Sequence, residues 1–96
     1  MNLQELFFGI DRAFGFSVED ILGRSKKQPL ASVRMLAVYL AREGRTLEQL
    51  GELFKRHYTN CLHSCRSIEQ RLETEDVQTV ELFLKLKEGI DGHINR

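Results

Sequence analysis

The sequence predicts an all-α fold, a bundle of about six helices that includes a helix-turn-helix. Apolar residues recur at i, i+3 and i+4 along most of the 96-residue chain, which is the spacing of amphipathic helices. The chain has one proline, seven glycines and no alternating runs of β-branched residues, so strands are not expected. This length allows one hydrophobic core, and we expect a single domain over residues 1–96.

The first two helices are bounded by glycines. An amphipathic helix is expected over residues 3–14, where the apolar residues share one face and Gly15 stops it. Ser17, with Asp20 three residues later, forms a capping-box pattern for a short second helix that ends near Gly23. A basic loop without periodicity, Arg24–Gln28, follows.

The third helix begins with a proline and is expected to stop at a glycine. Pro29 suits the first turn, because its missing N–H would have no partner there, and Gly44 marks the end. Its apolar stripe predicts these inward-facing residues: Val33, Leu36, Ala37, Leu40 and Ala41.

The next two helices form the helix-turn-helix. Thr46 and Gln49 make a capping box for the fourth helix, Lys55–His57 is long enough only for a turn, and the fifth helix starts at Tyr58. Gly51 lies inside the fourth helix, where glycine costs about 1 kcal/mol relative to alanine. We therefore expect the following helix to pass too close for a Cβ. A last helix is expected from about residue 74 to residue 90, with these residues inward: Val77, Val80, Phe83, Leu86 and Ile90.

Two cysteines lie in the fifth helix. Cys61 and Cys65 are four residues apart, so they stack on its apolar face and are expected to pack as small hydrophobic residues. A zinc site would add His57, but this spacing differs from the Cys-x-x-Cys of structural zinc sites. No metal, cofactor or catalytic residue is therefore predicted. Because no nucleophile–base arrangement or phosphate-binding loop is found, we expect neither an enzyme nor a nucleotide-binding protein.

Charge is unevenly distributed along this neutral chain. From residue 24 to residue 71 there are ten basic and four acidic residues, a balance of +6, and the flanks carry four basic and ten acidic residues, −6. A positive face can thus be presented to an anion although the total charge is zero. No apolar run is long enough for a membrane helix and no signal peptide is recognised, and two cysteines suit a reducing cytosol.

The other face of the fifth helix is polar. Its residues are Thr59, Asn60, His63, Ser64, Arg66 and Ser67. In a helix-turn-helix the start of the second helix enters the major groove, where Asn60 matches the edge of adenine and Thr59 and His63 suit several base edges. Arg56 and Arg66 are expected to reach phosphates. Together with the local positive charge, this pattern predicts binding to double-stranded DNA.

Four stretches in order, SVEDILGRSKK, AVYLARE, LEQLGELF and LHSCRSIE, resemble the C-terminal DNA-binding domain (domain IV) of the bacterial chromosomal replication initiator DnaA. The resemblance runs from Leu3 to Ile90. It implies a Trp-repressor-like, all-α domain that binds a short duplex, a role at replication origins, and a location in the cytoplasm at the bacterial nucleoid. It also implies two contacts with DNA. The helix that starts at Tyr58 enters the major groove, and the Arg24–Gln28 loop reaches the adjacent minor groove or the backbone.

Several positions match the family and others depart from it. Lys26 stands where the family has a minor-groove arginine, and Met35 stands for a glutamine. The family motif Asp-His-Thr-Thr-Val is replaced by residues 57–61, His-Tyr-Thr-Asn-Cys, and the turn is one residue shorter. The predicted DNA-binding residues are Lys26, Lys27, Arg34, Arg56, His57, Tyr58, Thr59, Asn60, His63 and Arg66.

Because the base-reading positions differ, we expect DNA binding with an altered target sequence. The family's ATPase module is not in these 96 residues. This favours a free-standing regulator or accessory factor of replication or transcription, and a domain of a longer initiator is the open alternative. The alternative is a protein-interaction module that kept the fold and lost base reading, with a protein partner engaged by the acidic flanks.

Overall fold

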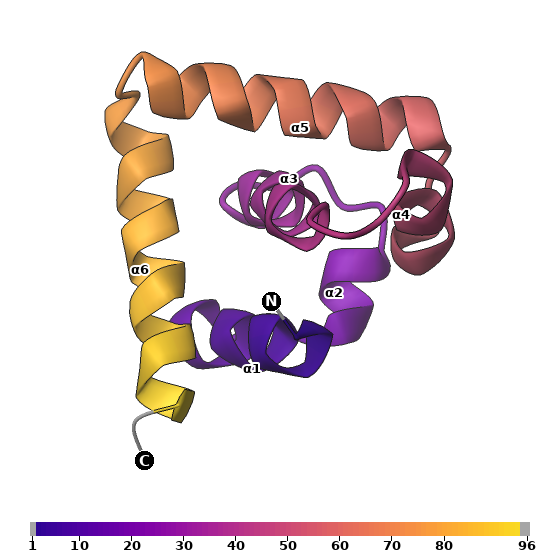
Figure 1. The fold of residues 1–96 in the computed structure, drawn as a ribbon. Helices are drawn as coiled ribbons and strands as arrows, with labels where there is room; N and C mark the ends of the chain where they lie inside the picture. Colours follow the sequence, from indigo (N-terminus) through magenta and orange to yellow (C-terminus); the bar gives the residue numbers. More distant parts are fainter. Residues whose placement is uncertain (1, 95–96) are drawn as a thin grey trace.

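A computed structural model describes the backbone of residues 2–94 and the side chains of residues 2–92. The described part contains helices and no strand, so the all-α prediction is confirmed (Figure 1). The six helices are α1 (Leu3–Phe14), α2 (Val18–Leu22), α3 (Leu30–Ala41), α4 (Leu47–Phe54), α5 (Tyr58–Glu73) and α6 (Val77–Ile94).

Helix α3 lies at the centre of the molecule and contacts each of the other five helices (Figure 1). It is buried on more than one side, since Val33, Ala37 and Val38 are all inaccessible to solvent. The chain wraps around it: α5 and α4 cover one side, and α1 with α6 closes the other. This central position explains why α3 is apolar almost throughout instead of showing a narrow stripe.

Most helix starts follow the local signals in the sequence. Ser17 and Asp20 form both hydrogen bonds of a capping box before α2, and Thr46 and Gln49 form both before α4. Gly15 ends α1 in the left-handed conformation, with φ 74°, which glycine adopts without strain. These expected boundaries are confirmed because each depends on residues within one helical turn.

Two predicted boundaries were wrong. Helix α3 ends at Ala41 instead of Gly44, since residues 42–44 already form a turn in which Gly44 has φ 75°. Helix α6 begins at Val77 instead of Thr74, because Thr74 ends α5, and it continues to Ile94. Val77, expected inward, is 67% exposed because it lies in the first turn of α6, at the corner beyond the core.

Helices α1 and α6 pack closely through glycines. A Cβ on Gly89 would lie 2.6 Å from the carbonyl oxygen of Gly9, and a Cβ on Gly9 would overlap the side chain of Ile90. The two backbones can approach this far only because neither glycine has a side chain. This contact holds α1 against α6, on the side of α3 away from α5 (Figure 1).

Candidate nucleic-acid interface

The helix-turn-helix is formed by α4, the turn at residues 55–57 and α5. Lys55 ends α4 in the left-handed conformation, with φ 56°, and the Arg56 N–H donates to the Gly51 carbonyl oxygen at 2.9 Å. The predicted three-residue turn is therefore confirmed. Its left-handed residue reverses the chain in so few residues that α5 starts directly against α4.

Gly51 allows this tight reversal. A Cβ at this position would lie 2.6 Å from the Arg56 carbonyl oxygen and 3.3 Å from the Tyr58 nitrogen. The predicted close approach is confirmed, and its partners are the backbone of the turn and the first residue of α5. A side chain at residue 51 would push the start of α5 away from α4.

The first turn of α5 carries polar side chains that are exposed to solvent. His57 is the N-cap, and its Nδ1 accepts a hydrogen bond from the Thr59 N–H at 3.2 Å. An accepting Nδ1 carries no proton, so the neutral ring has its proton on Nε2. The Tyr58 ring lies 4.5 Å from the His57 ring and is 46% exposed. Asn60, in the same turn, and His63, one turn further, are also exposed.

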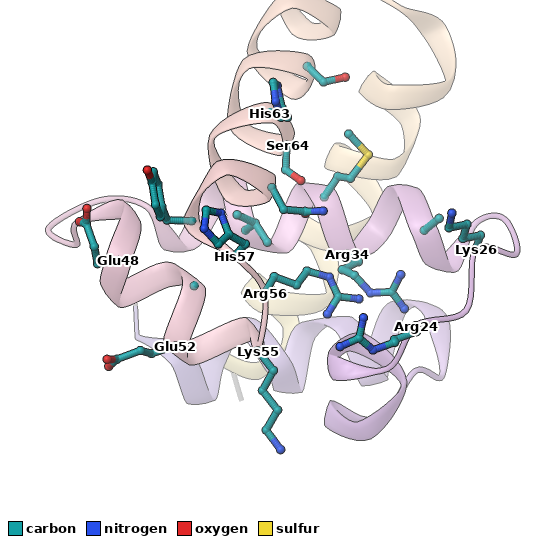
Figure 2. A pocket seen from close by; sticks show the side chains of 17 residues that line it. Arg24, Lys26, Arg34, Glu48, Glu52, Lys55, Arg56, His57, His63 and Ser64 are labelled. Carbon is teal, nitrogen blue, oxygen red and sulfur yellow. The ribbon is translucent and has the colours of Figure 1, made fainter.

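A groove joins this helix end to the basic loop. It is bounded by the loop at residues 24–26, by α3, by α4 and by the first turns of α5 (Figure 2). Seven predicted DNA-binding residues line it: Lys26, Arg34, Arg56, His57, Tyr58, Asn60 and His63. The other three lie outside its lining, Lys27 and Arg66 as exposed side chains and Thr59 half-buried.

Two of the three arginines that line the groove, Arg34 and Arg56, are already engaged by the protein. Arg34 is only 7% exposed, and its guanidinium donates to the carbonyl oxygens of Ile21, Ser25 and Asp20 at 2.7, 2.8 and 3.0 Å. The assignment of Arg34 to DNA rests on its match to the family sequence alone. Sequence reasoning had no signal for its backbone partners, because they lie nine to fourteen residues away in the chain.

Arg56 was expected to reach phosphates, and its guanidinium also turns inward. It donates to the Phe54 oxygen at 3.1 Å, to the Leu22 oxygen at 3.4 Å and to the Gly23 oxygen. Burial lowers the pKa of Arg56 and of Arg34, and a neighbouring positive charge lowers each further: Arg24 beside Arg56, and Arg56 beside Arg34. Both guanidinium groups remain cations. Positive charge is therefore concentrated on the side of the groove that carries Arg24, Arg34 and Arg56.

The opposite side of the groove is acidic. Glu48 and Glu52 of α4 lie across from Arg24 and Lys26 (Figure 2). Counting charges along the chain did not reveal this polarity. The i, i+4 spacing of the two glutamates, which puts them on one helical face, was the available signal.

The cysteines pack in the core as predicted. Cys61 is inaccessible, Cys65 is 8% exposed, both are free thiols, and burial raises the pKa of each. Ser64 was expected on the polar face but is only 7% exposed, because α5 packs against α3 along this side. Among the residues whose side chains are described, no three His, Cys, Asp or Glu residues are grouped as a metal site would require.

Comparison with known proteins identifies the family. The model of the bacterial DnaA protein helix-turn-helix matches residues 8–68, which is more than half of the chain and includes every residue that lines the groove. The chain belongs to this DnaA family. The resemblance noted in the sequence is thereby confirmed, and the match is to a DNA-binding domain and not to a catalytic one.

Individual DnaA proteins are similar over most of the chain. The chromosomal replication initiator protein DnaA 2 of Protochlamydia amoebophila (strain UWE25) is 32% identical over 76% of the chain and 17% of its own length. The DnaA of Picosynechococcus sp. (strain ATCC 27264 / PCC 7002 / PR-6) is 32% identical over 84% of the chain and 18% of its own length. That of Pseudothermotoga lettingae is 27% identical over 95% and 21%.

The chain thus spans about a fifth of the length of the DnaA relatives that it matches. The residues that the family model matches include the lining of the groove, α4, and α5 as far as Ile68. Within residues 2–94, no helix has the length and apolar character needed to cross a membrane.

Proposed function

We propose that this chain is a sequence-specific module for double-stranded DNA that serves as a regulator or accessory factor of replication or transcription. The start of α5 enters the major groove, and the Arg24–Gln28 loop follows the neighbouring minor groove and backbone. One observation carries the proposal: the polar end of α5 and the basic loop border a single open groove. Membership of the DnaA helix-turn-helix family supports it.

Base reading is assigned to the exposed end of α5. Asn60 is exposed and can pair with the N6 and N7 atoms of adenine. His57 offers its Nε2–H as a donor, because Nδ1 is occupied by the Thr59 N–H, and this favours an acceptor such as guanine O6. Tyr58, Thr59 and His63 complete the base-facing set. Because the N-cap of α5 is His57 and not a carboxylate, the DNA sequence that this chain prefers differs from the sequence that an N-cap carboxylate would read.

Phosphate binding is assigned to exposed cations near the groove. Lys26 lines it, and Lys27 and Arg66 are exposed on the loop and on α5. The N-terminus of the 16-residue α5 adds the favourable end of a helix dipole. Each phosphate neutralised makes the log–log slope of affinity against salt steeper by about 0.9.

Selection of bound duplexes from a random-sequence pool, repeated at two salt concentrations, tests the proposal. A consensus at both concentrations, with weaker binding at the higher one, is the expected result. Salt-sensitive binding without a consensus would mean that the module binds the backbone and does not read bases. Recovery of no duplex at either concentration refutes DNA binding and leaves a protein-interaction module as the function.

Two single substitutions separate base reading from phosphate binding. Asn60→Ala is expected to reduce discrimination between the consensus and a changed adenine by about 1–3 kcal/mol, with little effect on unrelated duplexes. Arg66→Ala should weaken all duplexes alike and reduce the salt slope by about 0.9. Equal effects of the two variants on every duplex would contradict the assignment of Asn60 to a base.

A further inference from the structure

Two arginines cover the C-terminal end of α2. The last carbonyl groups of a helix have no partner within the helix, and α2 has only five residues. Arg34 donates to the oxygens of Asp20 and Ile21, and Arg56 donates to those of Leu22 and Gly23. We call Arg34 and Arg56, with the carbonyl groups of α2 and the loop that they bind, the arginine clamp.

The clamp connects three elements that are separate in sequence. Arg34 projects from α3, and Arg56 lies in the turn directly before the N-cap of α5. Arg34 also donates to the Ser25 oxygen, which lies within the basic loop. The start of the loop is therefore tied to the central helix and to the start of α5 by hydrogen bonds from charged donors, which are stronger than those from neutral ones.

The planar guanidinium is what this arrangement requires. Each arginine binds three carbonyl oxygens with donors that point in fixed directions, which the single ammonium group of lysine cannot reproduce. Three hydrogen bonds of each guanidinium are thus made to the protein, from Nε, Nη1 and Nη2 of Arg34 and from Nη1 and Nη2 of Arg56, which leaves a minority of the five N–H donors of each group for a phosphate. Arg24 and Lys26, exposed on the loop that the clamp holds, remain oriented to the groove (Figure 2).

We propose that Arg34 and Arg56 are positioning residues that hold the Arg24–Gln28 loop in register with the start of α5, so that loop and helix engage two adjacent grooves of one duplex together. This inference rests on the proposed DNA-binding function. It reassigns the two arginines from direct DNA contact to preorganisation of the loop, which lowers the entropic cost of binding. Releasing the loop is expected to reduce affinity on the order of tenfold.

Order in the loop can be measured without DNA. Backbone ¹⁵N relaxation of the unbound protein should show residues 24–27 as rigid as the helices, and Arg34→Gln should make them mobile on the nanosecond timescale. Arg45→Gln is the matched control: Arg45 donates to the Ala41 oxygen at 3.0 Å near the end of α3, and it does not line the groove. Loop relaxation that is unchanged in Arg34→Gln, or already mobile in the unsubstituted protein, overturns the clamp.

A double-mutant cycle then tests the link to DNA. Affinity for a selected duplex is measured for Arg34→Gln, for Arg24→Ala/Lys26→Ala and for the triple variant. If Arg34 acts through the loop, its substitution costs about tenfold in the intact protein and almost nothing once the loop cations are gone. Equal losses in both backgrounds would show that Arg34 contacts DNA itself and would overturn the positioning role.

Arg34→Lys keeps the positive charge and removes the planar guanidinium. It provides a second test if Arg34→Gln does not fold. The clamp predicts that Arg34→Lys stays about as weak as Arg34→Gln and has a mobile loop. Affinity and loop order equal to those of the unsubstituted protein would overturn it. If the unsubstituted protein binds no duplex, the proposed function fails, and the relaxation experiment alone then decides whether the clamp orders the loop.

Discussion

Replacing Gly51 by alanine should damage the helix-turn-helix although alanine is the better helix former. The new Cβ would lie 2.6 Å from the Arg56 oxygen, which would have to retreat to at least 3.4 Å for ordinary contact. Overpacking of this kind costs about 1–3 kcal/mol, and a rigid backbone obstacle places the cost near the upper value. Within a helix, alanine is more favourable than glycine by about 1 kcal/mol. The free energy of unfolding should therefore fall by about 2 kcal/mol, the difference between these estimates.

Gly89→Ala provides a matched control. Gly89 is also inside a helix, and its Cβ would also meet a backbone oxygen at 2.6 Å, that of Gly9. This contact joins α1 to α6 and does not line the groove. We therefore expect a comparable loss of stability in the two variants, but a displaced start of α5 only in Gly51→Ala.

The assay combines urea unfolding with duplex binding under conditions where each variant is folded. Gly51→Ala should bind the selected duplex more weakly than its unfolded fraction explains, while Gly89→Ala should bind as the unsubstituted protein does. A Gly51→Ala variant of unchanged or increased stability would refute the reasoning, since it would mean that the turn relaxes at no cost.

Three further predictions concern stability and reactivity. The Asp76 carboxylate accepts from the Thr79 hydroxyl at 2.7 Å and from its N–H at 3.0 Å, and these hydrogen bonds lower the pKa of Asp76 below 3.8. The ionised Asp76 carboxylate stabilises the protein above pH 4, and this stabilisation is lost as the pH falls through the lowered pKa. Asp76→Asn should therefore lower the free energy of unfolding at pH 7 and make it depend less on pH in the acid range. Urea unfolding at a series of pH values measures both effects. Because burial raises the pKa of the Cys61 and Cys65 thiols, iodoacetamide should alkylate both at pH 8 only as fast as the protein opens, and labelling at the rate of a free thiol would contradict their burial. Phe54→Ala empties a fully buried site and should cost about 3–5 kcal/mol in the free energy of unfolding, whereas a loss below 1 kcal/mol would show that the core closes over the cavity.

Features that depend on neighbouring residues were predictable from the sequence. The capping boxes at Ser17 and Thr46 need only a partner three residues away, so they specify helix starts wherever the helices lie. The i, i+4 spacing of Cys61 and Cys65 placed both thiols on the packed face of α5. Gly51 predicted the close approach because its cost inside a helix requires a compensating contact.

Features that depend on distant residues were decided only by the tertiary structure. The sequence by itself determined that the chain forms helices, where most of them start, and that a polar helix end follows a tight turn. It could not show that Ser64 is covered by α3, that Val77 lies outside the core, or that Arg34 and Arg56 turn inward. The physical reason is that an arginine binds whichever carboxylate, phosphate or carbonyl oxygen the fold brings within reach. Here the fold brings the last carbonyl groups of α2 to both arginines, from positions up to 34 residues away in the chain.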